Sequence, residues 1–260
     1  MPLTDAQEMR YARHLILDEV GEEGQEKLLA SKVLVVGAGG LGSPLLMYLA
    51  AAGVGTLGVI DDDQVDITNL QRQIIHTTAS VGTPKVASAA TTIAALNPDI
   101  RVIQHAMRLD AGNADRIIGG YDLVADGTDN FDARYLLNEV CYRLRKPLVS
   151  ASLYRFEGQL TTYAPWRSDH AAPGGGPCLR CLFPDKPPPD LVPRCETAGI
   201  LGAVAGVLGT MQATEVFKEL LGLGESLSGR LLMYDALSAE TRIIKIKRDP
   251  ACTTCGAMAA

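Results

Sequence analysis

Three glycines near the start of the chain have the spacing of a phosphate-binding turn. Gly37, Gly39 and Gly42 fit the pattern G-x-G-x-x-G, with Gly40 between them, directly after a valine-rich run at 33–36. Glycines let the backbone turn tightly and approach phosphate oxygens, and the N-terminus of a following helix favours anions. The pattern therefore predicts a nucleotide site, and the absence of a P-loop signature excludes that class of ATPase. The alternative is a glycine turn that serves only close packing.

Charged side chains follow the next predicted strand, at 56–60. Asp61 lies about twenty residues past the glycines, where a carboxylate can accept hydrogen bonds from ribose hydroxyls. Ligands bind at the carboxyl ends of the strands in an open parallel sheet, so Arg72 is placed to meet phosphates. The alternative is an acidic turn with a surface arginine. The same segment contains three more polar residues: Asp63, Asn69 and Gln73.

A lysine stands where a helix is predicted to begin. Thr83 is the expected N-cap and Pro84 the expected first helical residue, which puts Lys85 in the first turn. A cation there opposes the helix dipole and costs roughly a few tenths of a kcal/mol, which an anion in front of it would offset. The position therefore favours a Lys85 that binds a ligand, and the alternative is a solvent-facing lysine.

Acids also follow the buried strand that is predicted at 123–125. A carboxylate from Asp126 or Asp129 could hold Mg²⁺ beside phosphates, because this hard cation prefers oxygen ligands. Asn130 comes next, before a helix predicted at 131–144. Asp129 therefore has a second interpretation, as the N-cap of that helix.

Four of the six cysteines form two C-x-x-C pairs, Cys178 with Cys181 and Cys252 with Cys255. Two paired dithiols predict one tetrahedral Cys₄ zinc site, in which four protein ligands leave no open position for a substrate. We therefore expect a metal clip that ties the C-terminus to the loop around 178. The alternative, a redox dithiol, usually lies at a helix start in a thioredoxin-like context that this sequence lacks.

The remaining cysteines are Cys141 and Cys195. Cys141 is interpreted as ordinary filling of a helix. Arg194 beside Cys195 would favour a thiolate, and the alternative for Cys195 is an unreactive thiol.

Strands and helices alternate along the first half of the chain. This alternation predicts an α/β fold with a Rossmann-like, mostly parallel sheet of five or six strands, continued by a mixed or antiparallel C-terminal extension. Pro/Gly-rich stretches at 173–177 and 185–190 predict an irregular crossing loop. Beyond the strands already given, we expect strands at 100–106, 146–151, 156–164, 230–235 and 241–247, and helices at 3–17, 45–52, 84–96, 111–118 and 200–221.

Composition narrows the class of protein. The chain has 260 residues and a formal net charge of -6, which argues against nucleic acid or an anionic membrane as partner. No apolar run reaches the roughly 18 residues of a membrane helix, and the polar start lacks the apolar core of a signal peptide. We therefore expect a cytoplasmic protein, in which paired cysteines indicate metal rather than disulfides.

The motifs together resemble the MoeB/ThiF family, the bacterial relatives of ubiquitin-activating enzymes. They are GAGGLG, the acids of IDDD, NLQRQ, the lysine of GTPK, DGTDN, both C-x-x-C pairs and a cysteine before AGILG. The resemblance implies ATP as the nucleotide, a dimer, and adenylation of the C-terminal Gly-Gly carboxylate of a small ubiquitin-like sulfur-carrier protein. It is nearest to the molybdopterin branch, with a MoaD-like carrier. The same chemistry on a ThiS-like carrier in thiamin biosynthesis is the alternative.

The resemblance also implies a role for each matching residue. The glycines of GAGGLG would line the phosphates, Asp61 would hold the ribose, and Asp129 would handle Mg²⁺. Arg13, otherwise a cation on a solvated helix edge, would reach across the dimer into the neighbour's site. The other nucleotide-site residues would be Asn69, Arg72 and Lys85 at the phosphates, with Asp63, Gln73 and Asn130 beside them.

Three parts follow from the same resemblance, within one continuous ThiF-type domain. They are an N-terminal helical arm at 1–30, an ATP-binding part at 31–152, and a carrier-binding part at 153–260 with the crossing loop and the zinc site. No rhodanese domain follows Cys255, so a separate sulfur donor is expected. Cys195 matches a cysteine that enters covalent sulfur transfer in the thiamin branch, a role that the molybdopterin branch does not imply.

The expected chemistry agrees with the residues. A C-terminal carboxylate has a pKa of about 3.5, so it is ionised at neutral pH and needs no general base. It needs neutralisation of charge, which Arg13, Arg72, Lys85 and Mg²⁺ would supply. Two other classes remain open. An NAD(P)-dependent oxidoreductase would share the glycine pattern, and a non-catalytic scaffold would bind the carrier without adenylating it.

Overall fold

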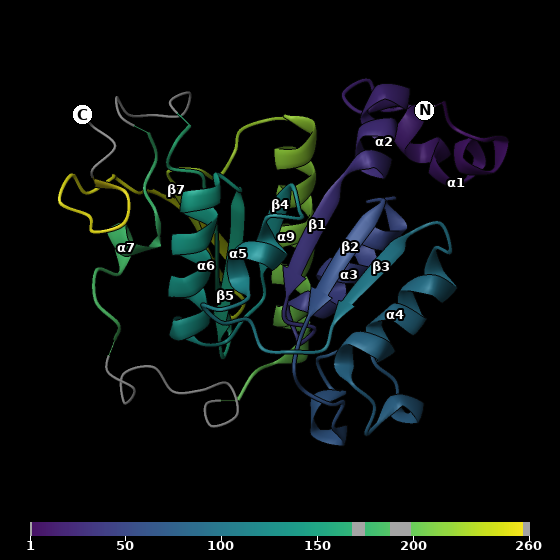
Figure 1. The fold of residues 1–260 in the computed structure, drawn as a ribbon, viewed down its shortest axis with the longest axis horizontal. Helices are drawn as coiled ribbons and strands as arrows, with labels where there is room; N and C mark the ends of the chain where they lie inside the picture. Colours follow the sequence, from purple (N-terminus) through teal and green to yellow (C-terminus); the bar gives the residue numbers. More distant parts are fainter. Residues whose placement is uncertain (1, 168–174, 188–198, 257–260) are drawn as a thin grey trace.

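The computed structural model describes residues 2–167, 175–187 and 199–256. A sheet of eight strands runs through the molecule in the order β3-β2-β1-β4-β5-β6-β7-β8 (Figure 1). Strands β1 to β5 pair in parallel, and β6, β7 and β8 continue the sheet in antiparallel pairs. The prediction of a mostly parallel sheet with an antiparallel C-terminal extension is therefore confirmed.

The strands are β1 (Lys32–Val36), β2 (Thr56–Ile60), β3 (Arg101–His105), β4 (Leu123–Asp126), β5 (Leu148–Tyr154), β6 (Glu157–Tyr163), β7 (Arg230–Asp235) and β8 (Glu240–Lys245). The α-helices are α1 (Asp5–Leu15), α2 (Gly21–Ala30), α3 (Gly42–Ala51), α4 (Lys85–Leu96), α5 (Ala114–Ile118), α6 (Phe131–Leu144), α7 (Leu179–Leu182) and α9 (Gly202–Leu221). Two short 3-10 helices are η1 (Ile67–Asn69) and η2 (Thr78–Ser80). None of the helices that the structure describes is long and apolar enough to cross a membrane.

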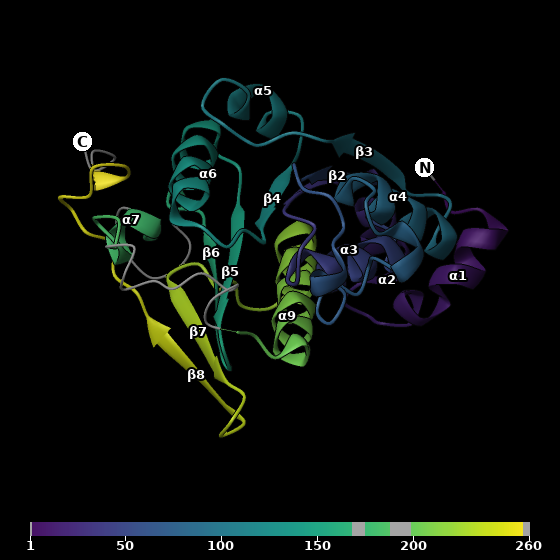
Figure 2. The same cartoon turned by 90° about the horizontal axis from the view of Figure 1, so that it is seen from below.

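Helices cover both faces of the parallel part of the sheet, which explains the apolar runs in its strands. Val33 and Val35 of β1 pack with α3, α4 and α9, whereas Leu34 and Val36 pack with α5 and α6. Successive side chains of a strand point to opposite faces, so a strand that is buried on both faces has no polar alternation. Figure 2 shows α5 and α6 on one side of the sheet and α3 and α9 on the other.

The N-terminal arm is fixed to the rest of the molecule by buried polar side chains. The Tyr11 hydroxyl accepts a hydrogen bond from Asn97 Nδ2 (2.9 Å), and Gln25 Nε2 donates to the carbonyl of Ala52 (3.0 Å). A Cβ at Gly53 would lie 2.7 Å from Gln25 Nε2, so glycine allows this close approach. These contacts hold α1 and α2 at the amino ends of the parallel strands, beyond the start of β1 (Figure 1). Helix α2 was not predicted from the sequence.

Two predicted helix starts were wrong by three residues. Helix α3 begins at Gly42, where 45 was expected, since the N–H of Ser43 already donates to the carbonyl of Gly39 (2.9 Å). Helix α5 begins at Ala114, where 111 was expected, because the Asp110 carboxylate accepts from the Gly112 N–H (2.8 Å) and keeps that stretch in a turn. Most other bounds agree within three residues.

The predicted start of α4 was wrong by one residue. Pro84 is the N-cap residue, with an extended ψ of 133°, and Lys85 is the first helical residue. Pro84 pairs with Gln64 in an isolated bridge, and the Lys85 N–H donates to the carbonyl of Asp63 (2.9 Å). These two contacts hold Pro84 out of the helix. Lys85 nevertheless lies in the first turn, as predicted.

Candidate functional site

One cavity opens at the carboxyl ends of the parallel strands and has a volume of about 1150 Å³. Parallel sheets place ligand sites at this edge, where the chain leaves each strand in a loop. The cavity brings together residues that are far apart in the sequence. Its lining includes ten predicted site residues: Gly37, Gly39, Gly40, Asp61, Asp63, Arg72, Gln73, Lys85, Asp129 and Asn130.

The glycine turn combines an exposed part and a packed part. Gly37 has a φ of 95°, a left-handed conformation that favours glycine. A Cβ at Gly42 would lie 1.9 Å from the carbonyl oxygen of Gly37, so the first turn of α3 can close on the loop only without a side chain there. Gly42 is buried and does not line the cavity. The packing alternative therefore holds for Gly42, while Gly39 and Gly40 face the open space.

Asp61 is bound to the glycine turn. Its carboxylate accepts hydrogen bonds from the N–H of Ala38 (2.8 Å) and the N–H of Asp63 (2.9 Å). Burial raises the pKa of Asp61, and the neighbouring charge of Lys85 and these two amides oppose that rise. A carboxylate has about four lone-pair positions, so two remain for ribose hydroxyls.

Lys85 is the most buried cation of the cavity lining. Its side chain is 7% exposed, and Nζ lies 2.7 Å from Oδ2 of Asp63, whose side chain is 66% exposed. An ammonium group has three donors, and this contact uses one of them. Lys85 can therefore bind an anion while it keeps its ion pair with Asp63.

Arg72 and Gln73 flank the glycine turn. Arg72 Nη1 donates to the carbonyl of Thr68 (3.2 Å), and its aliphatic part lies against Gly40. Gln73 is 4% exposed and lines the cavity beside Gly39, with no hydrogen-bond partner for Oε1 in the described part of the chain. Asn69 does not line the cavity; its carbonyl accepts from the N–H groups of Arg72 and Gln73 and so shapes this turn.

Asp126, the last residue of β4, and Asp129 lie in different surroundings. Asp126 is fully buried and accepts hydrogen bonds from Thr128 Oγ1 (2.7 Å) and Ser150 Oγ (2.8 Å). Asp129 is exposed and lines the cavity. The N-cap of α6 is Asn130, whose Oδ1 accepts from the Ala133 N–H (2.9 Å), so the capping interpretation of Asp129 is wrong. Asp129 is the acid that can hold a cation at the cavity.

Arg134, a further cation of the lining, was not predicted from the sequence. Its Nη2 donates to the carbonyl of Thr128 (2.8 Å), and its guanidinium lies 5.5 Å from the centre of the Phe131 ring. Its Nε is buried without a hydrogen-bond partner among the described residues, but it lies 3.9 Å from Oδ2 of the buried Asp126 in an ion pair. Arg134 lies in the first turn of α6, so the same unfavourable position in the helix dipole that drew attention to Lys85 would have identified it.

His76 is a second residue that was not predicted, and it contacts the backbone of the glycine turn. Its Nε2 lies 2.9 Å from the carbonyl oxygen of Ala38 and its Nδ1 lies 2.9 Å from Ser88 Oγ. A carbonyl only accepts, so Nε2 carries the proton and the Ser88 hydroxyl donates to Nδ1. Burial, the largest cause, lowers the pKa of His76, and the charge of Lys85 acts in the same direction.

The cavity continues over one face of the antiparallel extension. Pairing of Gln159 with Met233, and of Met233 with Arg242, places these side chains on the same face of β6, β7 and β8. Ser152 of β5 is paired with Gln159 and shares that face. All four line the cavity, whereas α9 packs on the opposite face. The nucleotide end is therefore continuous with a broad, partly polar groove.

Arg13, like Gly42 and Asn69, is a predicted site residue that does not line this cavity. Arg13 is exposed on α1, which the arm contacts hold at the opposite end of the parallel strands, so it does not reach the cavity of its own chain. Cys195 lies outside the described residues, as do 168–174 and the second half, 188–190, of the Pro/Gly-rich stretch at 185–190.

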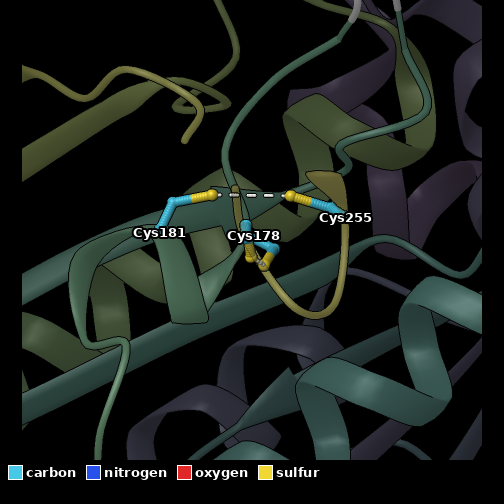
Figure 3. Close-up of side chains that lie close together, drawn as sticks. Cys178, Cys181 and Cys255 are labelled. Carbon is cyan, nitrogen blue, oxygen red and sulfur yellow. Dashed lines mark hydrogen bonds between the residues drawn. The ribbon is translucent and has the colours of Figure 1, made fainter. Parts of the chain in front are cut away.

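The paired cysteines meet in a separate cluster near the C-terminus (Figure 3). Their four Sγ atoms lie within 4.8 Å of one another, with 3.5 Å between Cys178 and Cys252 and 3.4 Å between Cys181 and Cys255. Zinc–sulfur bonds of about 2.3 Å in a tetrahedron require sulfurs about 3.8 Å apart, so the set fits the metal. The Asp249 N–H points to Cys181 Sγ (3.4 Å), a contact that favours a thiolate. The short helix α7, which was not predicted, begins directly after Cys178.

Comparison with known proteins gives close relatives over nearly the whole chain. The SAMP-activating enzyme E1 of Haloferax volcanii is 51% identical over 95% of this chain and 88% of its own length. The sulfur carrier protein adenylyltransferase of Thermus thermophilus is 48% identical over 95% of this chain and 90% of its own length.

Solved structures share the fold. The crystal structure of E. coli MccB with ATP has a TM-score of 0.80 at 23% identity and covers 95% of this chain and 74% of that chain. MccB with MccA-N7isoASN likewise has a TM-score of 0.80, at 22% identity, over 97% of this chain and 76% of that chain. Residues 11–254 match the ThiF family. Together with the relatives at about half identity, this match shows that the chain belongs to the ThiF family.

Proposed function

We propose that this chain is an adenylyltransferase that uses ATP to activate the C-terminal Gly-Gly carboxylate of a small ubiquitin-like sulfur-carrier protein. One observation carries the proposal: the glycine turn, Arg72 and Lys85 meet at a single cavity that continues into a groove. The relative from Thermus thermophilus, named a sulfur carrier protein adenylyltransferase, supports the same reaction class. The products are an acyl-adenylate and pyrophosphate.

The reaction joins two anions, so positive charge is the main requirement. The carrier carboxylate attacks the α-phosphorus of ATP, a new O–P bond forms, and the bond from that phosphorus to the bridging oxygen breaks as pyrophosphate leaves with the electron pair. Arg72 and Lys85 line the cavity and would neutralise the phosphates, and Arg134 of the same lining would add a third cation. Fixed charges in a partly buried site stabilise such a transition state without reorganisation.

Two metal ions are proposed, Mg²⁺ at Asp129 and Zn²⁺ at the four cysteines. Asp129 is exposed at the cavity and is not the helix cap, which leaves its carboxylate available for Mg²⁺ beside the phosphates. The four cysteine sulfurs would hold Zn²⁺ in a closed site, because they supply all four ligands of a tetrahedron. In this proposal Mg²⁺ serves the reaction and Zn²⁺ serves stability.

Different parts of the chain have different roles in this proposal. Residues 31–152 hold the nucleotide, and residues 153–260 receive the carrier in the groove over β5 to β8, with the arm at 1–30 on a dimer interface. Homodimerisation is proposed because Arg13 cannot serve its own chain's cavity. The favoured carrier is MoaD-like, in molybdopterin biosynthesis, with a ThiS-like carrier as the alternative. A separate sulfur donor, a covalent role for Cys195 and a cytoplasmic location stay predictions.

Mass spectrometry tests this function directly. The chain is incubated with ATP, Mg²⁺ and each MoaD-like or ThiS-like carrier of the host, and the intact carrier mass is measured. We expect a gain of one AMP on the preferred carrier and none on the same carrier without its last glycine. An AMP adduct on the truncated carrier would contradict the proposal. So would the absence of an adduct on every carrier tested.

A further inference from the structure

The first turn of α9 touches the backbone that carries Arg72. Gly202 is the first residue of α9, and a Cβ built on it would lie 2.2 Å from the carbonyl oxygen of Gln71 and 3.2 Å from the Cα of Arg72. Atoms packed in a protein do not approach a backbone oxygen that closely. Any larger residue at 202 therefore requires either the helix or the Gln71–Arg72 backbone to move.

A second contact joins α9, the glycine turn and the Arg72 side chain. A Cβ at Gly40 would lie 3.4 Å from Cβ of Ala205 and 3.6 Å from Cγ of Arg72, so Gly40 is enclosed between them. Ala205 is fully buried and lies about one turn after Gly202 in α9. The first turn of α9 thus contacts the backbone at Arg72, while the glycine turn contacts the aliphatic part of the arginine.

The start of α9 is itself anchored at the groove. Ile200, two residues before the helix, forms a parallel bridge with Arg155 in the turn between β5 and β6. Ile200 also lines the cavity. The chain entering α9 is therefore fixed to the sheet before it meets Gln71, so the helix end cannot withdraw freely when a larger residue is introduced.

We propose that Gly202 is a positioning residue for nucleotide binding. Because it lacks a side chain, α9 packs directly on the Gln71–Arg72 backbone and sets the distance between the guanidinium and the glycine turn. Gly202 touches no substrate and acts through Arg72 alone. The proposal rests on the proposed function, since it requires that Arg72 binds the phosphates of ATP.

The test compares two alanine substitutions in one helix. A Cβ at Gly206 would meet nothing within 4 Å, so Gly206→Ala adds the same methyl group to α9 without a collision. We expect Gly202→Ala to raise the Kd for ATP, measured by calorimetry without carrier, by roughly tenfold to a hundredfold, the effect of losing one hydrogen bond to a charged group. Gly206→Ala should leave the Kd unchanged. Equal affinities for Gly202→Ala and wild type would overturn the proposal.

A double-mutant cycle shows whether Gly202 changes ATP affinity through Arg72. In an Arg72→Ala background, Gly202→Ala should add no further loss of ATP affinity, whereas an undiminished loss would show that it acts elsewhere and overturn the proposal. If Gly202→Ala does not fold, Ala205→Gly removes the methyl group that packs α9 against Gly40 beside Arg72, without a collision, and an unchanged Kd there would count against the proposal equally. A wild-type chain that does not bind ATP would instead contradict the proposed function.

Discussion

At the scale of single residues, Lys85 carries the clearest prediction. Lys85→Met keeps the aliphatic packing of this buried side chain and removes its charge, while Asp63 stays solvated. We expect carrier-dependent adenylation to fall by about a hundredfold or more, as when one donor to a developing anion is lost, with Tm near that of wild type. Lys27→Ala, an exposed lysine on α2, is the matched control and should be neutral. Full activity of Lys85→Met would exclude Lys85 from the reaction.

His76 predicts a pH dependence of stability. Burial lowers its folded pKa below the ordinary 6.5, so the unfolded chain binds more protons between these two values. The stability that neutral His76 contributes is complete above pH 6.5 and is lost as the pH falls through the folded pKa. One proton changes the free energy of unfolding by at most about 1.4 kcal/mol per pH unit.

His76→Gln isolates this effect, because glutamine can still donate to the Ala38 carbonyl but does not titrate in this range. Denaturant unfolding of both proteins from about pH 7.5 to pH 5 should give a steeper decline for wild type than for the variant. Parallel curves would show that His76 does not titrate with unfolding.

Residue types, local spacing and the family resemblance together identified ten residues of the cavity lining. The roles of single residues were harder to predict, because they depend on partners from distant segments. Asp126 and Asp129 are equivalent in sequence, and only the hydroxyls of Thr128 and Ser150 show which one is engaged. His76 was missed because its partners, Ala38 and Ser88, belong to other elements.

At the scale of elements, the cysteine cluster ties the chain after β8 to α7. Cys252→Ser should lower the zinc content from about one ion per chain to nearly zero. It should also lower Tm by roughly 5–10 °C, because the lost cross-link contributes a few kcal/mol to the free energy of unfolding of a chain of this size. Metal analysis and calorimetry measure the two effects.

Cys141→Ala is the control for the cluster. Cys141 is buried in α6, where burial raises the pKa of its thiol, and its sulfur is not one of the four in the cluster. This variant should keep its zinc. A Cys252→Ser protein with full zinc content would contradict the shared site.

Element types were more predictable than element limits. The glycine turn and β1 combine local signals that agree, so this unit was predicted correctly. Helix α2 was missed because GEEGQEKLLA contains two glycines and a weak apolar pattern, and its position depends on the burial of Gln25 and Leu28. The start of α4 was wrong because the bridge between Gln64 and Pro84 is a tertiary contact.

At the scale of the whole molecule, the position of Arg13 predicts a site shared between two copies. The arm holds Arg13 at the end of the sheet opposite the cavity, so a partner's cavity is the one it can complete. Arg13→Ala and Lys85→Met homodimers should both be inactive. A mixed dimer keeps one site with both groups, so a random 1:1 mixture should recover about a quarter of wild-type activity.

Subunit exchange must be verified in the same sample, for example by native mass spectrometry of differently tagged chains. Confirmed mixed dimers without recovered activity would contradict donation of Arg13 across the interface. The sequence alone could not place Arg13, because the distance between the arm and the cavity is a property of the assembled fold.

The most direct test of the central claim is exchange of labelled pyrophosphate into ATP. If the cavity holds ATP with its α-phosphorus open to a carrier tail, label should enter ATP only when both Mg²⁺ and a carrier ending in Gly-Gly are present. Exchange should disappear when the carrier's terminal carboxylate is blocked as an amide. Label that enters ATP without carrier, or fails to enter with every Gly-Gly carrier of the host, would contradict the account.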